Sequence, residues 1–340
     1  MEQKKRRPWR RWVVLGLMIV GFILGGVGIF VPVQPEISVK AENLLGEGVA
    51  WFKLPVIGDF YLVNTLPTLA LTIILLLWLA WATNRSIKKS QKTDLVPRGV
   101  GNLMEAFFEM LYNLTEGSAG AKWAKTIFPW FATIMIYVLF ANLLKLIPGF
   151  ESIGVLHPAT GEGHTITSLG SGWSALLPQK VEEGGYILAP FFRGVSVDLN
   201  FTVSLAIIAV VAIQIVGFKA QGFGYLSKFF NFRTMFKTPF FGAMDFLVGL
   251  LELISELSKI LSFAFRLFGN MFAGVVLVAI VAGLLGKISI LPSMIMMFEL
   301  FVGIIQAFVF GMLTMVFMAQ ATQGHGHGEE HAEVAEAHEL

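Results

Sequence analysis

Long apolar runs separated by short charged segments dominate the pattern of this 340-residue chain. The runs lie near 13–31, 62–82, 127–148, 199–217, 240–286 and 290–320. A bilayer core of about 30 Å needs roughly 20 apolar residues of helix, which is the scale of these runs. Backbone groups in lipid must be satisfied within their own segment, and strict barrel-type alternation is absent, so helices are expected. The pattern predicts an all-α polytopic membrane protein with about six transmembrane segments.

The distribution of basic residues predicts the orientation of these spans. Basic residues gather before the first run, after the second and after the fourth, whereas the alternate loops hold few. The three groups are Lys4, Lys5, Arg6, Arg7, Arg10 and Arg11; Arg85, Lys88, Lys89, Lys92 and Arg98; and Lys219, Lys228, Arg233 and Lys237. By the positive-inside rule, both termini are predicted to lie in the cytoplasm.

The first run also has the form of a secretory signal peptide, because it follows a basic head. Gly26-Val27-Gly28 would be a weak cleavage site. The apolar stretch is long for a signal peptide, so we favour a retained anchor and keep cleavage as the alternative. We therefore divide the chain into 1–60 (anchor or signal run plus external segment), 61–322 (membrane domain) and 323–340 (a His- and Glu-rich tail expected to be disordered).

The connecting segments carry weaker signals. Residues 32–60 and 149–198 show no clear periodicity, and we expect irregular outer segments. Residues 99–116 repeat apolar side chains at helical spacing, which fits an amphipathic helix on the membrane surface or a connecting helix packed on protein. Lys145, at the end of the third run, is expected to extend to the outer surface.

Composition excludes several classes of function. There is no cysteine, so disulfides, thiolate metal sites and thiol nucleophiles are absent. The formal charge of +2 is too small to indicate a nucleic-acid partner. His157 and His164 stand without further ligands, so we expect neither a metal nor a cofactor.

The most informative segment is 238–286, whose roughly 70 Å of helix is more than twice a bilayer core. It must therefore break, tilt strongly or lie partly in the interface. Its charged residues and several polar ones share one face about 120° wide at 100° per residue. That face holds Glu252, Ser255, Glu256, Lys259, Ser262, Arg266 and Asn270.

Two interpretations of this face are open. It could hold structural ion pairs, such as Glu252 or Glu256 with Lys259. Charges within a span are costly, however, and several on one face usually line water or a polar partner, which favours a functional role. The next run adds Glu299 and Gln306, which share a helical face because they are seven residues apart.

Three motifs resemble those of the F-type ATP synthase a subunit. Phe265-Arg266-Leu267-Phe268-Gly269-Asn270-Met271 is similar to the R-L-F-G-N-x-x-A-G motif of that family. Gln306-Ala307-Phe308-Val309-Phe310 is similar to its Q-A-F-I-F segment. Asp198-Leu199-Asn200, with Ser204, looks like its D-x-N start of the preceding span. The resemblance covers roughly residues 60–322.

The resemblance implies a proton-translocating, non-catalytic stator subunit in a bacterial-type plasma membrane. Its last two long helices would form a tilted, membrane-embedded hairpin. Its partners would be the c-ring, the peripheral-stalk b subunits, the remaining ATP synthase complex and the lipid bilayer.

The resemblance also implies roles for single residues. Arg266 would face the c-ring, flanked by Asn270 and Gln306. Glu252, Ser255, Lys259 and Ser262 would line the cytoplasmic half-channel, and Glu299, Asp198 and Asn200 the outer one. Val275 departs from the acidic residue found in many members, which makes Glu299 the candidate for the main outer titrating group.

Other classes of protein explain the pattern less well. An ion-coupled secondary transporter would function alone and would show internal repeats, which are not evident. An intramembrane enzyme would need a nucleophile or a metal cluster within the spans, yet all six histidines lie outside the apolar runs. A passive scaffold does not explain charges on two helices.

Overall fold

The computed structural model describes residues 41–46, 48–55, 58–91, 99–147, 150–159, 161–170, 173–182, 184–228, 239–284 and 290–323. The predicted first span at 13–31 and nearly all of the predicted tail lie outside these residues. Within the described residues, five helices are long and apolar enough to cross a membrane. The polytopic helical class is therefore confirmed.

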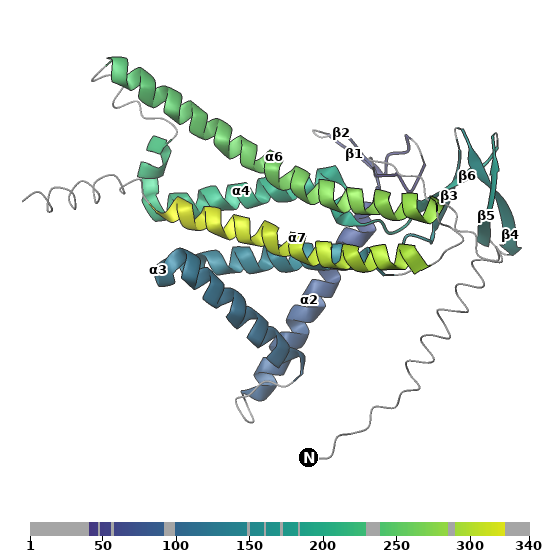
Figure 1. Ribbon diagram of the computed structural model, residues 1–340, viewed down its shortest axis with the longest axis horizontal. Coiled ribbons are helices and arrows are strands. Elements are labelled where there is room, and N and C mark those ends of the chain that lie inside the picture. The colour runs from purple at the N-terminus through teal and green to yellow at the C-terminus, as the bar shows by residue number, and fades with distance from the viewer. Residues whose placement is uncertain are drawn as a thin grey trace, which may run out of the picture. The chain divides into compact units, whose positions relative to one another are not determined.

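The five helices cover the predicted runs from residue 62 onward, and one of them also takes in nearly all of 99–116 (Figure 1). They are α2 (Thr65–Ser90), α3 (Val100–Leu144), α4 (Leu199–Gln221), α6 (Pro239–Leu284) and α7 (Ile290–Thr322). Two short 3₁₀ helices, η1 (Val195–Val197) and η2 (Gly222–Lys228), flank α4. Within the predicted segment 238–286, residues Pro239–Leu284 thus form one helix of 46 residues, not a broken pair.

The segments expected to be irregular contain β-structure, and that expectation was wrong. β1 (Phe52–Leu54) pairs antiparallel with β2 (Gly58–Phe60). Four more strands form a second sheet in the order β3-β6-β4-β5. They are β3 (Gly154–Pro158), β4 (Gly163–Gly170), β5 (Trp173–Val181) and β6 (Tyr186–Pro190). Two of the glycines that made this segment look irregular, Gly170 and Gly184, have positive φ at strand ends and between strands.

α3 changes direction at Gly120, where φ is 74° and ψ is 158° (Figure 1). Only glycine adopts such angles without strain. The part before the bend packs on the part after it, because the Phe128 ring contacts Phe108 and Tyr112 edge-on. These contacts fit a connecting helix packed on protein, although Leu103, on the predicted apolar face, is 64% exposed.

The chain divides into two compact units. Among the described residues, the first unit holds 41–68, 143–197 and 270–303, and the second holds 69–142, 198–269 and 304–323. In the second unit, the rings of Phe263 and Phe310 lie 5.1 Å apart, joining α6 to α7. In the first unit, Gly274 of α6 lies against Glu299 of α7. Within the second unit, Lys259 lies over the Phe317 ring and Phe263 lies next to Phe310, so the two helices run antiparallel there.

Close helix packing in the second unit depends on Gly311 of α7. A Cβ at this position would lie 2.8 Å from Met135 Cβ and 3.1 Å from a Phe131 ring carbon of α3. Small residues at such crossings let membrane helices approach closely.

We therefore expect Gly311→Ala to destabilise the protein by about 1–3 kcal/mol through overpacking. The thermal unfolding midpoint of the purified protein in detergent would measure this. Gly117→Ala on α3 is the matched control, because a Cβ there meets nothing within 4 Å. The control should be neutral or slightly stabilising, since alanine favours helix over glycine. Equal midpoints for the two variants would contradict the close packing.

Candidate functional site: charged residues within the spans

The first unit contains a buried ion pair between the end of α3 and α7. Lys145 Nζ lies 3.4 Å from Glu299 Oε2, with side chains 3% and 9% exposed. The same ammonium donates to the Met271 carbonyl of α6 at 3.4 Å. Lys145 therefore does not extend to the surface, which corrects the sequence-based expectation. Gly194 of the outer segment packs against its side chain, and the carboxylate on α7 offers it a partner inside the protein.

Glu299 owes its position to a glycine as well as to the lysine. Its Oε1 lies against the Cα of Gly274, in space that any side chain on α6 would occupy. This oxygen is buried and has no hydrogen-bond partner among the described residues. One carboxylate oxygen is thus held by a cation, while the other remains able to accept a hydrogen bond or a proton.

Glu151, which the sequence analysis did not single out, lies near this pair. Its Oε1 accepts a hydrogen bond from the Gly194 N–H at 3.3 Å. Burial raises the pKa of Glu151, and the pKa is lowered in part by that hydrogen bond and by the charges of Lys145 and Arg193. A single glutamate in a Gly-rich loop follows no helical period, so periodicity could not have identified it.

The second unit contains a separate polar network around Glu256 of α6. Glu256 Oε1 pairs with Lys259 Nζ at 2.8 Å, and Oε2 accepts from Gln214 Nε2 of α4 at 2.8 Å. Tyr225 of η2 then donates its hydroxyl to Gln214 Oε1 at 2.8 Å. Glu256 and Lys259 therefore form an ion pair of the kind that the structural interpretation names.

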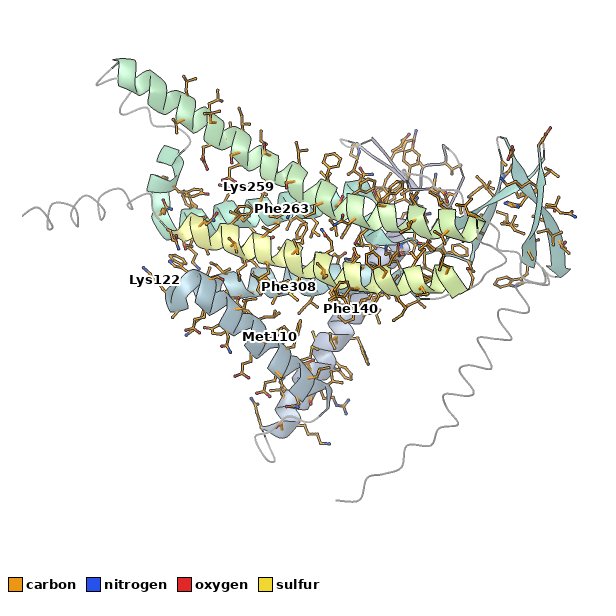
Figure 2. The ribbon with its side chains drawn as sticks, viewed as in Figure 1. Met110, Lys122, Phe140, Lys259, Phe263 and Phe308 are labelled. Atoms are coloured by element: carbon orange, nitrogen blue, oxygen red, sulfur yellow. The ribbon has the colours of Figure 1, made fainter. Side chains whose placement is uncertain are left out.

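Gln214 and Tyr225 were missed from the sequence because neither belongs to the polar face of α6. Gly217 makes room for the Tyr225 ring, whose Cε2 would lie 2.6 Å from a Cβ at that position. Lys259 also lies over the Phe317 ring of α7, at 4.8 Å. One turn further along α6 is Phe263, as Figure 2 shows. These contacts join α4, η2, α6 and α7 around one compensated charge.

Arg266 has a different environment. It lies midway along the apolar span Leu247–Leu284 and is exposed. Its Nη2 donates to Ser262 Oγ, one turn away, at 3.3 Å. It forms no ion pair with any carboxylate in the part of the chain that the structure describes. Ser262, on the same face, is exposed as well, and the bordering Leu261 and Phe265 are 57% and 54% exposed, so the described protein leaves this polar part of α6 uncovered at the arginine.

The remaining predicted residues are placed as follows. Asp198 caps α4 by accepting from the Asn200 N–H at 2.9 Å, which gives the D-x-N sequence a structural role. Glu252 is half-buried, Gln306 is buried, and Ser255, Asn200 and Asn270 are exposed. Asp198, Asn200 and Gln306 belong to the second unit, whereas Glu299 and Asn270 belong to the first.

The fold and these sites define a class, the polytopic membrane proteins that carry several charges within their spans. Comparison with known proteins identifies the family. The profile of the family described as ATP synthase A chain matches residues 66–319. The chain therefore belongs to the ATP synthase subunit a family, whose members are non-catalytic subunits of that complex. This assignment agrees with the family predicted from the motifs and argues against the alternative of a secondary transporter.

Individual relatives show a similar degree of likeness. ATP synthase subunit a of Campylobacter jejuni strain RM1221 is 30% identical over 69% of this chain and 84% of its own length. The subunit a of Acidothermus cellulolyticus is 30% identical, over 69% of this chain and 72% of its own. That of Desulforamulus reducens is 30% identical, over 74% and 76%.

Removing one member of the buried pair should destabilise the protein. We expect Lys145→Met to lower the free energy of unfolding by about 3–5 kcal/mol, because Glu299 is left as an uncompensated buried charge. The double variant with Glu299→Gln should regain much of that loss. Unfolding in detergent would measure both.

The matched control is Lys180→Met, which removes a surface pair with Glu162 whose side chains are 59% and 69% exposed. Exposed pairs contribute about 0–1 kcal/mol, so little change is expected. If Lys145→Met cost no more than this control, or if the double variant recovered nothing, the buried pair would be contradicted.

Proposed function

We propose that this chain is the proton-conducting stator subunit of a rotary ATP synthase, with Arg266 facing the ring of c subunits. The observation that carries the proposal is the exposure of Arg266 midway along an apolar span. Two pairs of charged residues described above are compensated within the protein, Lys145 with Glu299 and Lys259 with Glu256. Among the residues that the structure describes, Arg266 forms a side-chain hydrogen bond with the Ser262 hydroxyl and no ion pair.

A lipid environment is a poor match for this arginine. Placing Arg at the centre of a bilayer costs about 2.5–3.5 kcal/mol on insertion scales and more in simulations. A partner that carries acidic groups at the same depth would compensate the charge. A ring of c subunits supplies such carboxylates one after another, which fits an arginine left without an internal acid.

Arginine is chemically suited to separate two proton paths. The guanidinium group of arginine stays protonated in proteins, so it cannot relay a proton from one path to the other. A fixed positive charge also favours the ionised form of a facing carboxylate. Each ring carboxylate would therefore release its proton when it passes Arg266 and reload afterwards from the opposite path.

The outer half-channel would centre on Glu299. Its free oxygen beside Gly274 can accept a proton, while Lys145 holds the carboxylate in position. We add Glu151 to the predicted Asp198 and Asn200, because Glu151 is half-buried near the same pair and its raised pKa suits proton exchange. Such a path would operate with Val275 in place of an acidic residue.

The cytoplasmic half-channel would use Glu252, Ser255 and Ser262, with Asn270 and Gln306 flanking the arginine. Lys259 is better assigned to structure, because it pairs with Glu256 and lies over Phe317. A membrane potential supplies about 2.3 kcal/mol per proton per 100 mV, so several protons must pass for each ATP made. The b subunits and the rest of the synthase would complete the complex in the plasma membrane, with both termini of this chain in the cytoplasm.

Arg266→Ala should abolish ATP-driven proton pumping by the assembled complex in liposomes, measured with a pH-sensitive dye. The reason is that the carboxyl groups of the ring would no longer meet the positive charge that favours release of their protons. Arg85→Ala is the matched control, since Arg85 stacks over Trp81 at 5.4 Å on α2 and has no proposed role in the path. Normal pumping by the Arg266 variant would refute the proposal.

Glu299→Gln should slow proton uptake from the outer side, and ATP synthesis driven by an imposed potential should fall at least tenfold. The amide keeps the shape of the side chain but cannot cycle a proton. Glu162→Gln, an exposed change in the outer segment, should leave the rate intact. An unchanged rate in the Glu299 variant would remove this residue from the path and direct attention to Asp198.

A further inference from the structure

The β1–β2 ribbon, which precedes α2, has two chemically different faces. Its register pairs Phe52 with Phe60 and Lys53 with Asp59. Because successive side chains in a strand point to opposite sides, the aromatic pair and the charged pair lie on opposite faces. This part of the chain has no role in the function proposed above.

The aromatic face carries three rings in contact. Phe52 and Phe60 stack at 4.7 Å with an interplanar angle of 19°. The Trp51 ring lies 5.5 Å from Phe52 and 6.4 Å from Phe60. Trp51 and Phe52 are 58% and 43% exposed, so this aromatic cluster (Trp51, Phe52 and Phe60) is not covered by the described protein.

The opposite face is suited to water. Lys53 Nζ lies 3.6 Å from Asp59 Oδ1, with side chains 82% and 42% exposed. A pair this exposed contributes little to stability. The pair instead shows which face of the ribbon is polar. A ribbon with one charged face and one aromatic face can contact water on one side and an apolar environment on the other.

Backbone hydrogen bonds join the segment before the ribbon to the residues between the ribbon and α2. The Leu44 N–H donates to the Leu62 carbonyl at 2.9 Å, and the Asn64 N–H donates to the Glu42 carbonyl at 3.0 Å. α2 begins at Thr65. Five residues of extended chain reach at most about 17 Å, so the ribbon cannot lie far from the end of a membrane span.

The Asn43 side chain closes the loop that leads into the ribbon. Its Nδ2 donates to the Gly46 carbonyl at 2.6 Å and to the Val49 carbonyl at 2.8 Å. The Leu45 N–H in turn donates to Asn43 Oδ1 at 3.1 Å. These hydrogen bonds fix the conformation of the loop, so the start of the ribbon is held in one orientation.

We propose that the aromatic cluster inserts into the lipid interface at the Thr65 end of α2, while Lys53 and Asp59 face water. Aromatic side chains concentrate at the boundary between headgroups and acyl chains. Trp51 contributes an indole N–H that can bond to headgroups while its ring enters the apolar region. The lipid surface is favoured over a protein partner because the cluster is held within reach of a span that itself lies in lipid.

The absence of cysteine from this chain permits a direct test. A nitroxide would be attached to Phe52→Cys or to Lys53→Cys, in the complete complex in phospholipid nanodiscs and with the other subunits free of reactive cysteine. Spin-label accessibility to oxygen, which concentrates in lipid, would be compared with accessibility to a water-soluble nickel chelate. We expect position 52 to favour oxygen at least threefold relative to position 53, and position 53 to favour nickel.

Two results would overturn the proposal. Equal nickel accessibility at the two positions would place both faces in water. Exclusion of both reagents from position 52 would show that protein covers the cluster. Because Phe52→Cys removes one stacked ring, Trp51→Cys, which keeps the Phe52–Phe60 stack, provides a second labelled position. It should report lipid as position 52 does.

Discussion

A charge held inside an apolar helical protein needs a partner, and this constraint organises the polar chemistry of the structure. Lys145 meets it through Glu299 and the Met271 carbonyl. Glu256 meets it through Lys259 and Gln214. Because the partners lie on different elements, each compensated charge also joins those elements. In the second unit the network extends through Tyr225, so one buried carboxylate holds α4, η2 and α6 together.

Small residues make these contacts possible. Gly274 leaves the space that the Glu299 carboxylate occupies, Gly194 lets the outer segment close over Lys145, and Gly217 admits the Tyr225 ring. In lipid there is little hydrophobic drive between helices, so close backbone approach and interhelical polar contacts carry the association. The glycines therefore provide the space in which the buried charged side chains reach their partners.

The sequence predicts most of the helical architecture because hydrophobic length and helical period are local properties. It also singles out Arg266 and the polar face of α6. It does not predict which charge pairs with which, because Gln214 and Glu256 are 42 residues apart, and Lys145 and Met271 are 126 apart. Lys145 was placed at the surface for this reason. The strands between 154 and 190 were missed because their glycines favoured an irregular loop over turns between short strands.

Charges that are paired within the protein differ from the charge of Arg266, for which we propose a functional role. If Arg266 were paired internally, as Lys145 and Lys259 are, its charge would already be satisfied and could not respond to an acid that arrives and leaves. Exposure of an arginine within an apolar span carries an energetic penalty in lipid, and an acidic partner at the same depth would relieve it. Under the proposed function, the same penalty that makes this arginine unsuitable for lipid would favour association with an acidic neighbour. A neutral residue at this position would suit lipid better and would have no means of distinguishing a protonated carboxyl from an ionised one.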